Sequence, residues 1–191
     1  MKKIILLVGA SGSGKSTLVR CVKLCDKTVK ELESYTTRPK RNENETGHKF
    51  VSIKQFDRLK NKVAHTEING NKYCATEAQM KKSDIYVIDP HGVDVLLDTY
   101  KGDKEVVVVR LKCSRFACFL NMLKRGDGII NICKRIIHDW YKFSEGNIMD
   151  IINEKRTEIK PQYIELNTSH PTDYNIKKIL TILDKAKVHW K

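Results

Sequence analysis

The chain has no apolar stretch that approaches the roughly 20 residues of a membrane-spanning helix. Its opening Met-Lys-Lys and the short apolar run at 4–8 lead into a glycine-rich loop and not into a small-residue cleavage site, so they do not indicate a secretory signal. The six cysteines form no C-x-x-C pair, and buried free thiols are expected in a reducing compartment. We therefore expect a cytoplasmic protein without a membrane partner.

Acidic residues are scarce relative to basic ones, with 23 Asp and Glu against 36 Lys and Arg and a formal net charge of +13. Such an excess can indicate nucleic-acid binding, the handling of highly anionic small ligands, or only a solvated basic surface. The basic residues are dispersed along the chain, and no nucleic-acid-binding motif accompanies them. Charge alone does not choose between these classes, and we do not expect a nucleic acid to be required.

The clearest motif is residues 9–17, GASGSGKST, which fits the pattern G-x-x-x-x-G-K-[ST] of a P-loop. It follows an expected strand at 2–8 and precedes an expected helix at 15–25, which favours a phosphate-binding loop over a Gly/Ser-rich turn. Lys15 would reach the β- and γ-phosphates, and the Ser16 hydroxyl would contact magnesium. The expected phosphate-binding residues are Ala10, Ser11, Gly12, Ser13, Gly14, Lys15, Ser16 and Thr17.

Two further features suggest phosphate chemistry. Arg38 and Arg41 flank a proline-containing polar stretch, so irregular backbone would present them as a fork for a phosphate monoester or simply as a solvated basic loop. Asp89 ends an apolar strand expected at 84–89, where a P-loop protein carries its second magnesium anchor. The alternative for Asp89 is a cap on the helix that begins near Val93.

Strands and helices alternate along the chain, without internal repeats. This order predicts one α/β domain with a parallel sheet covered on both faces. Further strands are expected at 28–32, 50–53, 64–68, 72–74, 105–111 and 162–166. Further helices are expected at 52–61, 77–82, 114–124, 129–143 and 173–188.

In this order the motifs resemble the guanylate kinase family over nearly the full length. The matching segments are the P-loop, SYTTRPKR at 34–41, GNKYCAT at 70–76, IDPHGV at 88–93, LKRG at 123–126, ICKR at 132–135, and Asn167. The resemblance implies a P-loop NTPase fold with a parallel sheet flanked by helices, a small mixed acceptor-binding subdomain and a helical lid. The implied single domain, 1–191, divides into a core at 1–33, 84–113 and 160–191, an acceptor-binding subdomain at 34–83 and a lid region at 114–159.

The resemblance also implies a nucleoside monophosphate kinase that uses ATP and Mg²⁺ to phosphorylate GMP or dGMP. The residues that it assigns to phosphoryl transfer are Lys15, Arg38, Arg125 and Arg135. Those that it assigns to the acceptor are Ser34, Arg38, Arg41, Tyr73 and Thr76, with Asn167 near the ATP base and with Ser16 and Asp89 at magnesium.

The chain departs from the family pattern mainly where the acceptor base is read. Ala64 and Ala75 stand where a glutamate and a serine are expected, His48 stands in place of a tyrosine, and Asn121 replaces a lid arginine. We therefore expect relaxed base selectivity. A kinase of another monophosphate or of a sugar phosphate, a non-catalytic binding module, and a nucleic-acid-dependent NTPase remain alternatives, although Lys15 argues against a non-catalytic module. The oligomeric state is left open.

Overall fold

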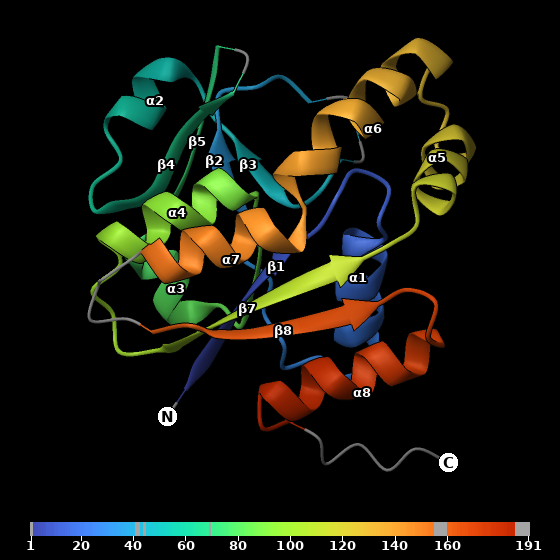
Figure 1. Cartoon of the computed structure of the whole chain (residues 1–191). Coiled ribbons are helices and arrows are strands. Elements are labelled where there is room, and N and C mark those ends of the chain that lie inside the picture. Colours follow the sequence, from blue (N-terminus) through green and yellow to red (C-terminus); the bar gives the residue numbers. More distant parts are fainter. Residues whose placement is uncertain (1, 41–42, 44, 69, 155–159, 186–191) are drawn as a thin grey trace.

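The computed structural model describes residues 2–40, 43, 45–68, 70–154 and 160–185. Its centre is a parallel sheet with strand order β6-β1-β7-β8 (Figure 1). These strands are β1 Lys3–Val8, β6 Ile85–Val87, β7 Glu105–Lys112 and β8 Gln162–Asn167. Because the strands run in one direction, their carboxyl ends meet at one edge, where ligands bind in open α/β sheets. The P-loop, Asp89, Cys113 and Thr168 all follow these ends.

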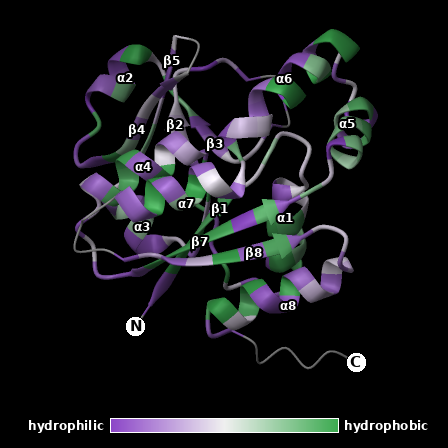
Figure 2. Cartoon of the chain, in the orientation of Figure 1, coloured by the Kyte–Doolittle hydropathy of each residue, from purple (hydrophilic) through white to green (hydrophobic). Residues whose placement is uncertain are grey.

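Helices cover both faces of this sheet. Alternate side chains of β1 point to opposite faces, and both sets are buried because each meets a helical layer. One layer contains α4 and α7, and the other contains α1 and α8 (Figure 1). Their bounds are α1 Lys15–Cys25, α4 Pro90–Thr99, α7 Glu145–Glu154 and α8 Thr172–Ile182. In Figure 2 β7 and β8 accordingly carry green, hydrophobic segments, which alternate with purple ones.

A second, smaller sheet lies beside the first, with strand order β3-β2-β5-β4. It is mixed, because β2 pairs with β3 in parallel and with β5 antiparallel. Its elements are β2 Ser34–Thr36, β3 His48–Phe50, α2 Ile53–Asp57, β4 Lys62–Ile68, β5 Asn71–Thr76 and α3 Glu77–Lys82. Val63 and Met80 join the core cluster that contains Val93 and Leu97 of α4, so this sheet packs directly on the central domain.

Two helices stand over the carboxyl edge of the parallel sheet. α5 (Arg115–Lys124) and α6 (Ile129–Lys142) pack together through Cys118, Met122 and Ile132. Gly126, with φ of +87°, lies in the turn that joins them. Among the described residues, no helix has the length and apolarity needed to cross a bilayer.

The sequence predicted most elements, but some expectations were wrong. Residues 28–32 do not form a strand; only Glu31 makes an isolated bridge, to Ile85. The strand expected at 50–53 ends at Phe50, because Ser52 caps α2 with a capping box. The helix expected at 52–61 ends at Asp57, and the helix expected at 173–188 ends at Ile182. Buried thiols are found at Cys74 and Cys118, whereas Cys133 is exposed on α6.

Helix α7 was not predicted and lies within the range expected to form the lid. Its Ile148 is buried in the core cluster, and Ile151 and Ile152 pack against the same cluster. This helix therefore covers the central sheet beside α4, whereas α5 and α6 have a small apolar cluster of their own. The division into core, acceptor-binding subdomain and lid stays a proposal.

Candidate active site

The P-loop connects β1 to α1, and close packing explains two of its glycines. A Cβ on Gly9 would lie 2.8 Å from the Leu111 carbonyl oxygen. A Cβ on Gly12 would lie 2.5 Å from the Cys118 carbonyl oxygen, and Gly12 also has φ of +77°, which favours glycine. The loop therefore lies directly against β7 and α5, with no side chain between them.

Lys15 begins α1 and folds back over the loop. Its Nζ donates hydrogen bonds to the carbonyl oxygens of Gly9, at 2.6 Å, and Ala10, at 2.9 Å. Burial lowers the pKa of Lys15 to about 8, although the negative charge of Asp139 opposes part of this shift. At neutral pH the ammonium group is still mostly charged, as a role in neutralising phosphate oxygens requires.

The P-loop backbone already binds an anionic side chain. The N–H of Ser11 donates a hydrogen bond of 2.6 Å to Oδ2 of Asp139, a buried carboxylate from the last turn of α6. This contact shows that an oxyanion fits against the loop, as expected of a phosphate-binding turn. Sequence reasoning did not identify Asp139, because the two partners are 128 positions apart in the chain.

The predicted arginines are engaged by carboxylates as well. Arg38 holds Glu45 as a fork, with Nη2 2.7 Å from Oε1 and Nη1 3.3 Å from Oε2, and its guanidinium lies 5.4 Å from the centre of the Phe50 ring. This is the bidentate geometry with which arginine also binds phosphate.

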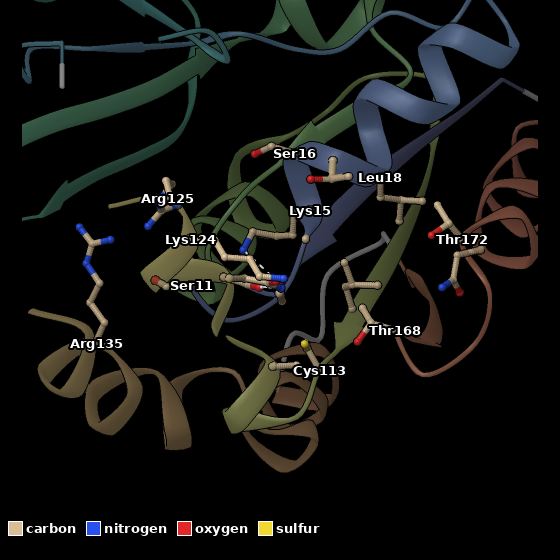
Figure 3. Close-up of a pocket in the computed structure, with 18 of the residues that line it drawn as sticks. Ser11, Lys15, Ser16, Leu18, Cys113, Lys124, Arg125, Arg135, Thr168 and Thr172 are labelled. Carbon is tan, nitrogen blue, oxygen red and sulfur yellow. Dashed lines mark hydrogen bonds between the residues drawn. The ribbon is translucent and has the colours of Figure 1, made fainter. Parts of the chain in front are cut away.

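In the segment α5–α6, which the sequence predicts to be a lid, Arg125 and Arg135 share Asp127. Arg135 Nη1 is 3.0 Å from Asp127 Oδ2, and Arg125 is ion-paired with the same carboxylate. Figure 3 shows these two arginines on one side of Ser11 and Lys15, with Thr168 and Thr172 on the other. The lid arginines are thus held together at the edge of the same cavity as the P-loop.

Two cavities meet at the P-loop. The larger, of about 970 Å³, extends between the P-loop, α5, the start of α6 and the loop before α8. The smaller, of about 350 Å³, lies between the two sheets. Four residues line both cavities: Ser11, Lys15, Arg38 and Tyr73. Arg125 and Arg135 line the larger cavity, and Ser34 and Asp89 line the smaller one.

The smaller cavity contains a set of hydroxyl groups and an imidazole. The Ser34 hydroxyl lies 2.8 Å from His48 Nδ1 and also hydrogen-bonds the Tyr86 hydroxyl, whose pKa is raised by burial. Ala64 lines this cavity at a register shift between β4 and β5, with φ of +52°. The shift turns Thr66 inward, where it is 5% exposed, while Glu67 stays at the surface.

Asp89 takes the capping role with one carboxylate oxygen, and its other oxygen is left for the metal role that the sequence predicted. Its Oδ1 accepts a hydrogen bond of 3.0 Å from the Gly92 N–H and caps α4. Its Oδ2 is buried, no hydrogen-bond donor is aligned on it in the described part of the chain, and Lys142 Nζ lies 2.7 Å away. A buried carboxylate oxygen that faces a cation suits magnesium, which prefers oxygen ligands. Ser16 is exposed and lines the larger cavity, so the two predicted magnesium ligands border different cavities.

Some predicted residues are not brought to these two cavities. Thr76 caps α3, where its hydroxyl accepts a hydrogen bond from the Gln79 N–H. The Asn167 side chain accepts one from the Ser169 N–H, and nearby residues line the larger cavity instead: Thr168, His170, Thr172 and Asn175. Ala10 lines neither cavity, and Arg41 lies outside the described residues.

No protein-family model matches the chain. Curated proteins named guanylate kinase match part of it. The protein from Polaromonas sp. is 31% identical over 100 residues, which cover 50% of this chain and 46% of the relative. The protein from Agrobacterium fabrum is 31% identical over 111 residues, covering 52% and 50%. The chain spans about half the length of the curated relatives that it matches.

Solved structures show the same fold over the whole chain. A guanylate kinase from Anaplasma phagocytophilum matches with a TM-score of 0.57 and 19% identity, covering 98% of this chain and 88% of that one. In sequence the chain is thus similar to guanylate kinases over about half of its length, and in fold it is similar to one over nearly all of it. A sugar kinase from Janibacter sp. matches with a TM-score of 0.53 and 18% identity over the whole of both chains, and at this identity the likeness concerns the fold alone.

Against the guanylate kinase pattern, Asn121 has a defined place in this chain. Its side-chain amide donates a hydrogen bond of 2.8 Å to the Gly12 carbonyl oxygen and ties α5 to the P-loop. The resemblance expects an arginine at this position, so the cation of the family pattern is replaced here by a neutral contact between α5 and the P-loop.

Proposed function

We propose that this chain is a guanylate kinase-like enzyme that transfers the γ-phosphoryl group of ATP to a nucleoside monophosphate, with GMP or dGMP as the leading acceptors. The observation that carries the proposal is the shared border of the two cavities. Lys15 of the P-loop and Arg38 of the small sheet line both of them, so a donor in the larger cavity and an acceptor in the smaller one would meet between these two cations.

The proposed catalysis depends on positioning and charge, because phosphoryl transfer needs little covalent help from the protein. Lys15 and the P-loop N–H groups would hold the donor phosphates. Arg38, which already binds a carboxylate as a fork, would orient the acceptor phosphate. Arg125 and Arg135 would approach from the lid and stabilise the charge that develops during transfer while water is excluded.

The residues that would hold magnesium are Ser16, through its hydroxyl, and Asp89, through its carboxylate. The bound ion would neutralise phosphate charge and fix the geometry of the donor. Both side chains are oxygen donors, and Asp89 already faces the ammonium group of Lys142, which supports a cation at this place.

The test is a coupled assay of ADP formation with magnesium, ATP and GMP, together with direct detection of GDP. The control is Lys15→Ala, with folding checked by circular dichroism. We expect GDP to form with the wild type and transfer to be abolished in the variant, because the P-loop ammonium stabilises the phosphates. A folded Lys15→Ala protein with activity within about threefold of wild type would overturn the P-loop assignment. Absence of transfer to any monophosphate, despite ATP binding, would favour the binding-module alternative or a sugar acceptor.

A further inference from the structure

The last turn of α6 directs two opposite charges at the P-loop side of the site. Asp139 and Lys142 are three positions apart, so their side chains leave the same face of the helix. Asp139 accepts the hydrogen bond from the Ser11 N–H at 2.6 Å, and Lys142 Nζ lies 2.7 Å from Asp89 Oδ2. One helical turn therefore contacts both elements to which the proposed function assigns the donor phosphates and their metal.

The charges of this turn correspond to those of a magnesium–nucleotide. The carboxylate of Asp139 places anionic oxygen against the loop, where a phosphate oxygen is expected. The ammonium of Lys142 places a positive charge beside Asp89, where the metal is expected. The negative charge of Asp139 thus lies against the P-loop, where the proposed function places a phosphate. The positive charge of Lys142 lies beside Asp89, where the proposed function places magnesium.

These contacts are held in place by hydrogen bonds outside the site. Arg110 of β7 donates from Nε to the Phe143 carbonyl oxygen at 2.9 Å, and the Asn147 side-chain amide donates to the Lys142 carbonyl oxygen at 2.8 Å. Asp139 is 8% exposed and also lies 3.3 Å from His138 Nδ1. The turn is therefore anchored to the core and to α7, and its charges do not reach the site from a frayed helix end.

Carboxylates also occupy the other side chains that are predicted to contact phosphate. Glu45 occupies the fork of Arg38, and Asp127 occupies the lid pair Arg125 and Arg135. Asp139 differs from these two carboxylates because it contacts P-loop backbone, and because Lys142 on the same helical face supplies the matching cation.

We propose that Asp139 and Lys142 form an internal competitor of the magnesium–nucleotide, which must leave Ser11 and Asp89 before the donor binds. The proposal rests on the proposed function, because it assigns the donor site to the P-loop. It couples donor binding to α6, the helix that also carries Arg135. The position of Arg135 would then depend on whether the side chains of Asp139 and Lys142, on the same helix, have been released from the donor site.

The first test is equilibrium binding of the non-hydrolysable ATP analogue adenylyl imidodiphosphate by calorimetry, with and without magnesium. The variants are Asp139→Asn and Lys142→Met, which keep size and remove charge. The matched controls are Asp150→Asn on α7 and Lys134→Met on α6, both exposed. We expect Asp139→Asn to bind the analogue roughly three- to tenfold more tightly, because a charge-assisted contact no longer competes. Lys142→Met should need less magnesium for half-maximal binding.

A second measurement follows α6 directly. Trp140 lies between the two charged residues, and the other tryptophan is Trp190, so a Trp190→Phe background makes Trp140 the single reporter. We expect the analogue to change Trp140 emission in the wild type, and ligand-free Asp139→Asn to show much of that change already. Trp140 emission thus shows whether tighter binding by Asp139→Asn comes with a change at the end of α6 or results only from the loss of a negative charge near the nucleotide.

The outcomes are distinguishable. If the wild type binds the analogue while Asp139→Asn binds it equally or more weakly, Asp139 supports the loop and does not compete, and the inference is wrong although the proposed function stands. If neither protein binds it, both the inference and the donor site fail. Tighter binding by Asp139→Asn, with unchanged controls and a shifted Trp140 signal, supports the competitor.

Discussion

At the scale of single residues, the lowered pKa of Lys15 makes a prediction about pH. The pH dependence of kcat/KM reports the free enzyme. Because burial brings the pKa of Lys15 to about 8, we expect kcat/KM for ATP to fall as pH rises through about 8. The Asp139 charge raises this pKa, so in Asp139→Asn the fall should begin at a lower pH. A profile that stays flat to pH 10 in both proteins would contradict an essential Lys15 ammonium.

The same pKa predicts the sign of a stability effect. The unfolded chain binds more protons than the folded one between the lowered pKa of about 8 and the ordinary lysine pKa of 10.5. Lys15 therefore disfavours folding below this range, and the penalty is relieved as pH rises through it. We expect Lys15→Met to unfold at a higher temperature than wild type at pH 7 and to lose this advantage near pH 10. Calorimetric melting at both pH values tests this, and an unchanged difference would contradict it.

Arg38 is predicted to hold the acceptor and not the donor. Its fork binds two carboxylate oxygens of Glu45, and a charge-assisted hydrogen bond contributes about 1.5–3 kcal/mol. We expect Arg38→Ala to raise the acceptor KM by roughly 10- to 150-fold and to leave the ATP KM within a few-fold. Arg58→Ala, exposed after α2, is the matched control. An increase confined to the ATP KM would assign Arg38 to the donor site.

At the scale of elements, Thr76 has a structural role in the capping of α3, whereas the resemblance assigned it to acceptor binding. Its hydroxyl caps α3, and the Gln79 side chain accepts a hydrogen bond from the Thr76 N–H to complete the capping box. We expect Thr76→Ala to cost about 1 kcal/mol of stability without changing the acceptor KM, and Thr76→Ser to restore the stability. Thermal unfolding and steady-state kinetics of both variants test this. A raised acceptor KM at unchanged stability would instead support the binding role.

The sequence predicted the elements whose signals are local. Helix α1 follows from the P-loop, and both α1 and α3 were predicted with the bounds that the structure shows. Helix α7 was not predicted, although its Ile148 is buried in the core cluster. Residues 28–32 have strand-like composition, yet only Glu31 finds a strand partner.

The sequence predicted less of the candidate site, because much of it depends on contacts between distant segments. The P-loop, Arg38 and the arginines at 125 and 135 could be proposed because their motifs are local, and the structure places them around one cavity. Asp139 and Lys142 lie in a segment that looks like an ordinary amphipathic helix. Their contacts with Ser11 and Asp89 exist only because the fold places the end of α6 over the parallel sheet.

At the scale of the whole molecule, the smaller cavity, in which we propose that the acceptor binds, lies where the two sheets meet. β4 packs on α4, and Ala64 and Ala75 belong to the apolar cluster shared by the small sheet and the core. These are the positions at which the resemblance expects a glutamate and a serine. Ala64 and Ala75 are 2% and 0% exposed, so the packing of the core, and not recognition of a base, accounts for a small apolar residue at these positions. Whatever reads the acceptor base must come from other residues around this cavity.

We therefore expect weak selectivity for the base of the acceptor nucleotide. A site that hydrogen-bonds a base rejects analogues without the matching groups by factors on the order of 10⁴, because its own polar groups would be left unpaired. Hydroxyl groups such as those of Ser34 and Thr66 can donate or accept a hydrogen bond, so they impose a smaller penalty than a fixed carboxylate. We expect kcat/KM for GMP and dGMP to exceed those for AMP, dAMP, CMP, UMP and dTMP by less than about a thousandfold. Thr66→Val, which removes one hydroxyl and keeps the shape, should alter the order among the bases. A larger preference for GMP that Thr66→Val leaves intact would mean that other residues supply a strict reader.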